Sequence, residues 1–274
     1  MSIIIPIVAV TIIGIICGVM LVVASKFMAV PEDETFIAVR ECLPGANCGA
    51  CGYAGCDGYA HALADGEITA TNLCVPGGAD AAAQVADAMG LEAGEVIAKV
   101  AYVACCGDSA CTSQKHEYVG IKTCSASRLL FSGDGHCSYG CLGYGDCVAV
   151  CPNHAIQIVD GLSRVTPSLC VGCGLCARAC PNHLIHIVPD TVKTIVHCSN
   201  QDKGAVTRKA CTRGCIGCKK CEKECPACAV KVVNNLAVID YDQCTNCGHC
   251  KDICTTGCIE EARLYTASKH PQKA

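Results

Sequence analysis

Cysteines spaced two and three residues apart dominate this chain. The spacing C-x2-C-x2-C-x3-C occurs three times, with proline after the last cysteine in two runs and Thr255 in that place in the third. The runs are Cys170, Cys173, Cys176 and Cys180; Cys215, Cys218, Cys221 and Cys225; and Cys244, Cys247, Cys250 and Cys254. In such a run three thiolates bind one iron–sulfur cubane, and the fourth cysteine ligates the other cluster of a pair. The spacing therefore predicts paired [4Fe–4S] clusters.

A fourth run has wider spacing but also ends in Cys-Pro. It consists of Cys137, Cys141, Cys147 and Cys151. Aligned on the cysteine before proline, it matches the run at 215–225, except that Tyr144 stands opposite Cys218 and Cys137 opposite Cys211. Further upstream, the alignment pairs Cys124 with Cys198. We interpret this as an internal duplication in which Cys137 supplies the missing thiolate.

A separate cysteine pattern precedes these runs. Cys48, Cys51 and Cys56 lie on one glycine-rich loop, and Cys74 follows after a segment expected to form a short helix at 57–65. Glycines between the ligands let the backbone wrap closely and direct N–H groups at sulfur. Four cysteines with a C-x2-C pair also suit a structural zinc site. Iron–sulfur and zinc are therefore both open for this set.

The crossover rule assigns twenty cysteines to five [4Fe–4S] clusters. The sets are Cys48, Cys51, Cys56 and Cys74; Cys137, Cys141, Cys147 and Cys180; Cys151, Cys170, Cys173 and Cys176; Cys215, Cys218, Cys221 and Cys254; and Cys225, Cys244, Cys247 and Cys250. The remaining cysteines are expected to be small buried apolar residues. The alternative is a sixth cluster drawn from Cys105, Cys106, Cys111, Cys124, Cys198 and Cys211, which lack the regular spacing.

Composition narrows the class of protein. The 274 residues include 30 cysteines and no tryptophan, and the formal net charge is −4. A long chain with clustered cysteines and no secretory signal favours metal ligation in a reducing compartment over disulfides. The near balance of acidic and basic residues gives no electrostatic support for nucleic-acid binding.

The N-terminal segment is apolar. Residues 3–24 carry no charge, and a run of that length is enough to cross the roughly 30 Å hydrocarbon core as a helix. A signal peptide is the alternative, but no basic residue precedes the run and no small-x-small cleavage site follows it. Gly14 and Gly18 have the spacing that permits close helix approach, and Lys26 follows the run. The expectation is a single-pass anchor in the cell membrane with the cluster domains on the cytoplasmic side.

The expected fold class is α+β. It consists of a single N-terminal transmembrane helix, a small [4Fe–4S] domain and two tandem bacterial ferredoxin-like modules that each bind two clusters. The boundaries are an anchor at 1–26, the [4Fe–4S] domain at 27–104 with a polar linker at 26–36, a connector at 105–136, the first module at 137–190, a connector at 191–214, the second module at 215–265 and a tail at 266–274. Residues 79–89 and 92–103 are expected to be helical. Strands are expected at 155–160, 163–166, 229–233 and 237–241, with Asn234 and Asn235 as a hairpin turn.

The chain contains no nucleotide-binding loop and no catalytic motif. Neither a Walker loop nor G-x-G-x-x-G after a strand occurs, and no histidine lies in H-E-x-x-H. The charged stretch of Lys219, Lys220, Glu222, Lys223 and Glu224 forms either a solvated helix face or a docking patch whose lysines attract an acidic redox protein. We therefore expect the chain to move electrons and to have no catalytic residues of its own.

The order of an apolar segment, NCGACGYAGC with CVPGG, and tandem ferredoxin motifs resembles the B subunit of the Rnf complex, an ion-translocating ferredoxin:NAD oxidoreductase. The segments CSYGCLGYGDC and HCSNQDKG…GCIGC are similar to the longer clostridial-type B subunits. The resemblance implies electron entry from reduced ferredoxin, transfer to flavin-bearing membrane subunits, and reduction of NAD coupled to Na⁺ or H⁺ pumping. Thr255 and the spacing of the run at 137–151 depart from the regular pattern.

Two alternatives remain at this point. One is a membrane-tethered polyferredoxin of a hydrogenase or another reductase. The other is a non-redox adaptor that holds structural zinc. Within the favoured interpretation, the tandem modules accept electrons and the cluster of Cys48, Cys51, Cys56 and Cys74 delivers them onward.

Overall fold

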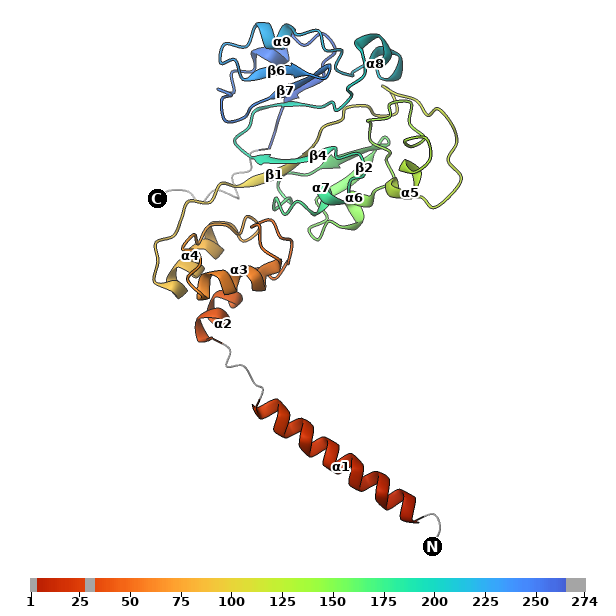
Figure 1. The fold of residues 1–274 in the computed structure, drawn as a ribbon. Helices are drawn as coiled ribbons and strands as arrows, with labels where there is room; N and C mark the ends of the chain where they lie inside the picture. Colours follow the sequence, from red (N-terminus) through yellow and green to blue (C-terminus); the bar gives the residue numbers. More distant parts are fainter. Residues whose placement is uncertain (1–3, 28–32, 265–274) are drawn as a thin grey trace.

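The computed structural model describes residues 4–27 and 33–264. Helix α1 (Ile4–Phe27) stands apart from a small helical domain, which is followed by two modules built from short strands and cysteine-bearing loops (Figure 1). The predicted linker at 26–36 lies partly, and the predicted tail at 266–274 wholly, outside the described residues.

Helix α1 forms where the apolar segment was expected, but the expected membrane span is not supported. Across the described residues, no helix has both the length and the apolar character needed to cross a bilayer. The predicted fold class is therefore wrong in its single N-terminal transmembrane helix.

Three helices build the small domain: α2 (Glu34–Glu41), α3 (Gly55–Ala64) and α4 (Gly78–Met89). The Asp33 carboxylate caps α2 by accepting a hydrogen bond from the Thr35 N–H at 2.9 Å. Helix α4 ends at Gly90, whose φ of 65° suits a residue without a side chain. Tyr59 and Leu63 are almost fully buried between these helices. The packed helices leave the loop with the first cysteines on one side of the domain.

The first module contains two antiparallel strand pairs. Its strands are β1 (Lys99–Val103), β2 (Ile156–Val159), β3 (Leu162–Val165) and β4 (Ile185–Pro189), and its helices are α5 (Cys124–Arg128), α6 (Asp146–Ala149) and α7 (Leu175–Ala179). β1 pairs with β4, with Ala101 opposite Ile187, and β2 pairs with β3 across a turn at Asp160 and Gly161. Both turn residues have positive φ, as a tight two-residue hairpin requires.

β1 corrects the expectation of a helix at 92–103. The segment before it has no regular structure, and Lys99–Val103 is a strand whose last four residues are buried. Alanine-rich sequence favours a helix locally, but pairing with β4 and burial in the module core decide the outcome. The first module therefore begins at β1, within the part of the chain assigned to the N-terminal domain.

The second module repeats this arrangement. It contains β5 (Thr194–Val196), α8 (Gly204–Ala210), α9 (Lys220–Lys223), β6 (Val230–Val233), β7 (Leu236–Ile239), α10 (His249–Asp252) and β8 (Ile259–Glu261). β5 pairs with β8, and β6 pairs with β7. The predicted hairpin turn is confirmed, since Asn234 and Asn235 have φ of 48° and 64°. The two modules lie against each other, with the second farther from the N-terminal domain (Figure 1).

Equivalent strands correct the alignment of the duplication. β1 and β5 hold the same place in their modules, because each pairs with the last strand. Cys105 follows the end of β1 by two residues, and Cys198 follows the end of β5 by two residues. Cys198 therefore corresponds to Cys105, and its pairing with Cys124 in the sequence alignment is wrong.

Glycines allow the ligand loops to approach other backbone segments. Gly172 lies between two predicted ligands with φ of +68°, and a Cβ there would lie 2.6 Å from the Lys99 carbonyl oxygen. Gly143 and Gly217 are equally close to the turns of the β2–β3 and β6–β7 hairpins, at 2.6 and 2.9 Å. Each ligand loop can therefore pack this closely against the neighbouring backbone only because the residue at this position is glycine.

Gly172→Ala should lower the thermal unfolding midpoint of the anaerobic holoprotein, because the positive φ costs about 1–3 kcal/mol and the clash with Lys99 adds to it. Gly174→Ala is the matched control, since it has φ of +74° but its nearest neighbour is Ile187 Cγ1 at 3.9 Å. Equal shifts for the two variants would show that the close approach to β1 contributes nothing.

Candidate iron–sulfur sites

The N-terminal domain surrounds one cavity with four sulfurs. Cys48, Cys51, Cys56 and Cys74 line it together with Leu43 and Tyr59. The Asn47 side-chain oxygen accepts a hydrogen bond from the Cys56 N–H at 2.8 Å and so fixes the start of α3 against the loop. The structure brings this predicted set together.

The first module contains a second complete set. Cys151, Cys170, Cys173 and Cys176 line one cavity, with Ala155 and Ile187 beside them. Backbone N–H groups point at sulfur: Ala101 donates to Cys170 Sγ at 3.4 Å and Ala155 to Cys151 Sγ at 3.3 Å. Such N–H donors stabilise thiolate and influence the reduction potential of a bound cluster. β1 is thus part of a cysteine site although it carries none of the ligands.

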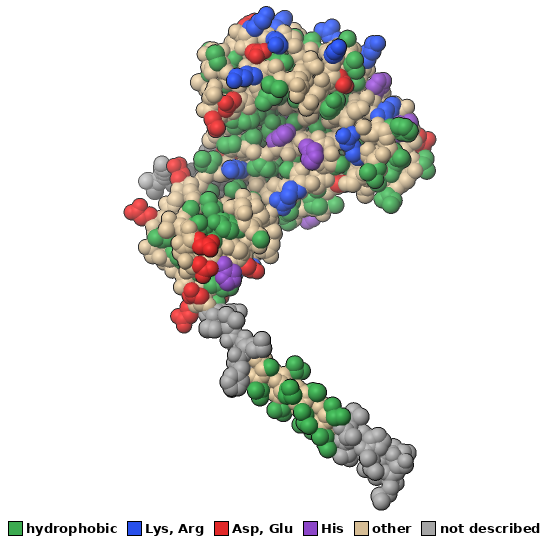
Figure 2. Space-filling model, in the orientation of Figure 1, with side chains coloured by type: hydrophobic (Ala, Val, Ile, Leu, Met, Phe, Trp, Pro, Cys, Tyr) green, Lys and Arg blue, Asp and Glu red, His purple; other side chains and the backbone are tan. Residues whose placement is uncertain are grey.

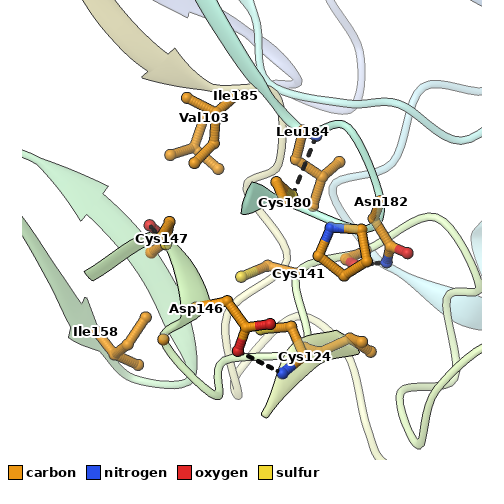
Figure 3. Close-up of a pocket in the computed structure, with 15 residues that line it drawn as sticks. Val103, Cys124, Cys141, Asp146, Cys147, Ile158, Cys180, Asn182, Leu184 and Ile185 are labelled. Carbon is orange, nitrogen blue, oxygen red and sulfur yellow. Dashed lines mark hydrogen bonds between the residues drawn. The ribbon is translucent and has the colours of Figure 1, made fainter. Parts of the chain in front are cut away.

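The other site of the first module differs from the predicted set by one cysteine. Its cavity is lined by Cys124, Cys141, Cys147 and Cys180 (Figure 3). Cys124 occupies the place expected for Cys137.

The Asp146 carboxylate explains why Cys124 reaches this cavity. It accepts hydrogen bonds from the backbone N–H of Cys124 at 2.7 Å and of Ser125 at 2.9 Å, which holds the start of α5 against α6 (Figure 3). The position opposite Cys218 is filled by Tyr144, whose hydroxyl donates to Asp134 at 2.7 Å instead of facing a metal. No regular spacing marks Cys124, so spacing alone could not find it. The hydrogen bonds that Asp146 accepts at the start of α5 place Cys124 at this cavity.

The second module holds two further sets. Cys215, Cys218, Cys221 and Cys254 line one cavity, which Thr255 also borders. Burial raises the pKa of the Cys250 thiol, and three neighbouring thiols raise it further. Those neighbours are Cys244, Cys225 and Cys247, so the fifth predicted set also lies together. Thr255 in place of proline does not remove Cys254 from its cavity.

Burial raises the pKa of several of these thiols and so favours their protonated form in the absence of metal. It raises the pKa of Cys176 and of Cys221 to about 12 and that of Cys141 to about 11. Cys254 and Cys215 behave differently, because hydrogen bonds from the Cys258 thiol, which lies 3.6 Å from Cys254 Sγ, lower their pKa values to about 4 and about 6. Metal binding must displace the protons of the thiols with raised pKa values, so uptake releases protons and contributes to folding free energy.

Apart from sulfur, the four cavities are lined mostly by apolar side chains. Among the described residues, no three His, Cys, Asp or Glu side chains converge as ligands of a single metal ion. A [4Fe–4S] cluster is held by four thiolates. Four cysteines around an apolar cavity, with N–H groups aimed at sulfur, fit such a cluster.

The N-terminal site adjoins the first module. The Arg178 guanidinium on α7 donates a hydrogen bond to the Cys48 carbonyl oxygen at 2.6 Å. Cys48 also contributes to the raised pKa of Cys173, to which burial contributes most. The site of the N-terminal domain is thus the neighbour of the set that contains Cys173.

Two segments that carry these cysteines resemble known iron–sulfur families. Residues 43–76 match the family described as a putative Fe-S cluster, and residues 164–186 match the 4Fe-4S binding domain. The B subunit of the Na(+)-translocating ferredoxin:NAD(+) oxidoreductase complex of Acetobacterium woodii is 44% identical, over 94% of this chain and 78% of its own length.

Two further relatives are matched over nearly their whole length. The B subunit of the proton-translocating ferredoxin:NAD(+) oxidoreductase complex of Clostridium ljungdahlii is 45% identical, over 94% of this chain and 92% of its own. The B subunit of an ion-translocating oxidoreductase complex of Methanosarcina acetivorans is 40% identical, over 90% and 94%.

Cys124→Ala should lose one cluster, about four irons per chain, because it removes a thiolate from the cavity at α5. Iron and acid-labile sulfide in anaerobically purified protein measure this loss. Cys228→Ala, which changes an exposed cysteine outside the predicted sets, is the control. Full iron content in the Cys124 variant would show that another residue, and not Cys124, is the fourth ligand of this site.

Proposed function

Because the chain belongs to the family of B subunits of ion-translocating ferredoxin:NAD oxidoreductase (Rnf) complexes, we propose that it receives electrons from reduced ferredoxin and relays them to flavin-bearing subunits of such a complex. Membership makes it an iron–sulfur electron-transfer subunit of an oxidoreductase. The observation that carries the proposal is the succession of cysteine sites through three adjoining domains. We propose five [4Fe–4S] clusters for the sets described above, with Cys124 as the ligand beside α5.

The clusters, when bound, supply one-electron centres. The chain's own residues hold them with thiolates, surround them with apolar side chains that exclude water, and aim backbone N–H groups at sulfur. No acid, base or nucleophile is required of the protein, because electron transfer makes and breaks no substrate bond.

Electron entry is proposed at the second module. Its segment 191–264 contains eleven basic and eight acidic residues, whereas residues 33–98 contain ten acidic residues and one basic residue. Figure 2 shows Lys and Arg side chains gathered over the second module and Asp and Glu over the N-terminal domain. An acidic donor such as ferredoxin is attracted to the first surface and repelled by the second.

The ligands of the second module are also the most accessible. Cys218 and Cys247 are exposed, and Lys219, Lys220 and Lys223 are exposed directly beside Cys218. A donor docked on these lysines would lie next to the cavity lined by Cys218. The N-terminal domain, at the other end of the succession of sites, is the proposed exit to the other subunits.

We also propose that the chain works at the cytoplasmic side of the cell membrane, bound to those subunits. The support is the family itself, since an ion-translocating complex acts across a membrane and reduced ferredoxin and NAD are held in the cytoplasm.

Replacing Lys219, Lys220 and Lys223 together with glutamate should raise the KM for ferredoxin by about 10-fold or more and flatten its dependence on salt, because it reverses the charge at the proposed dock. Ferredoxin oxidation by the holoprotein at several ionic strengths measures both. Lys209→Glu, an exposed change on α8 of the same module, is the control. An unchanged salt dependence in the triple variant would place the dock elsewhere.

Arg178→Gln should leave the iron content and the KM for ferredoxin unchanged but lower kcat of the assembled complex by roughly tenfold, because small displacements of paired redox domains have large effects on rate. The variant removes the hydrogen bond to Cys48 without touching a thiolate. Arg208→Gln on α8 is the control. A normal kcat would contradict transfer between the first module and the N-terminal domain.

A further inference from the structure

Four cysteines outside the five sets form two equivalent pairs. Cys105 and Cys198 each follow the first strand of their module by two residues. Cys137 and Cys211 each precede the first cysteine of the following run, Cys141 or Cys215, by four residues. The duplication therefore supplies the same two cysteines from each module, although no regular spacing connects the four.

The structure brings these four thiols together. A Cβ on Gly107 would lie 3.4 Å from Cys211 Sγ and 3.7 Å from Cys105 Sγ, so both sulfurs lie against the same glycine. Asn200 contacts the other two: its side-chain amide donates to Cys137 Sγ at 3.3 Å, and its backbone N–H donates to Cys198 Sγ at 3.5 Å.

Electrostatic effects among the thiols agree with this grouping. Burial raises the pKa of Cys105 to about 12 and that of Cys198 to about 11, and it also raises the pKa of Cys211. Cys137 raises the pKa of each of these three thiols further. Cys137 is thus a neighbour of the other three thiols, and all four side chains are buried or partly buried.

Asn200 is oriented to favour a thiolate. It is 2% exposed, and its side-chain oxygen accepts hydrogen bonds from the Asp202 N–H at 2.7 Å and the Thr207 hydroxyl at 3.2 Å. With its oxygen so engaged, the amide nitrogen must face Cys137. A buried N–H donor aimed at sulfur is the same arrangement that the set of Cys151 and Cys170 has.

The group lies between the two modules. Cys198 Sγ accepts a hydrogen bond from the Cys215 N–H at 3.2 Å, and Cys215 belongs to the set of the second module that also contains Cys254. On the other side, the backbone and the thiol of Cys141 both affect the pKa of Cys105, so the two residues are neighbours, and Cys141 belongs to the set at α5. The group therefore adjoins one site of each module.

We propose that Cys105, Cys137, Cys198 and Cys211 hold a further [4Fe–4S] cluster that connects the two modules. It would accept one electron from the site of Cys215 and pass it to the site of Cys141. Neighbouring Cys106 is not a ligand, because its thiol donates to the Arg213 carbonyl oxygen at 3.6 Å and packs in the core of the second module. This inference depends on the proposed function only in treating the other cysteine sets as cluster sites.

Iron and acid-labile sulfide in the full-length, anaerobically purified chain test the proposal. The expected content is about 24 irons per chain with matching sulfide, against about 20 for five clusters. About 20 irons, with or without one zinc, overturns the further cluster while leaving the proposed function intact. Little iron of any kind would overturn both.

Variants then locate the ligands. Cys137→Ala and Cys211→Ala should each lose about four irons, whereas Cys106→Ala should keep the full content. Spin quantification of the reduced protein by electron paramagnetic resonance should show the loss of one cluster and not of several, which separates ligand removal from unfolding. Loss in the Cys106 variant, or none in the Cys137 variant, overturns the assignment.

Discussion

Sulfur at the centre of each module is the constraint on which the rest of this structure depends. Every sheet in the described residues has two strands, and such pairs are marginally stable alone. The buried cluster of residues in the first module mixes Cys147, Cys170 and Cys176 with Ile156 and Leu184. Burial raises the pKa of Cys147 and of Cys176, so it opposes the thiolate form that a cluster needs unless metal is bound. Cluster uptake and folding are therefore expected to be a single process.

The same constraint explains the arrangement of the domains. Neighbouring cysteine sites lie close together because a strand or a side chain of one segment contacts the ligand loop of another. Ala101 on β1 donates to Cys170, and Arg178 on α7 reaches back to Cys48. Charge is divided along this succession, with basic residues at one end and acidic residues at the other (Figure 2). The two ends of the molecule therefore carry opposite charge, and each end is suited to a partner of the other sign.

Regular cysteine spacing predicted most of the sites, because three ligands on a tight loop and a fourth on the following segment are determined locally. The cavities at Cys48, Cys151 and Cys215 contain the expected residues. Cys124 could not be found this way, since it reaches its cavity through Asp146, a contact across 22 residues.

Other elements also required long-range information. The strand at Lys99–Val103 lies in alanine-rich sequence that favours a helix, and only its partner β4 makes it extended. The apolar N-terminal segment formed a helix as expected, but length and uncharged composition were insufficient evidence for its crossing a membrane.

The pairing of β1 with β4 bears on how the chain is made. β1 leaves the ribosome well before β4, because α5, α6, the β2–β3 hairpin and α7 are synthesised between them. The N-terminal domain, with all its ligands within residues 48–74, can close first. The first module must wait for its last strand, with its thiols exposed to oxidants meanwhile. Delivery of iron and sulfide is therefore expected to follow the order of translation, and an oxidising pulse during synthesis would damage the modules while sparing the domain already closed.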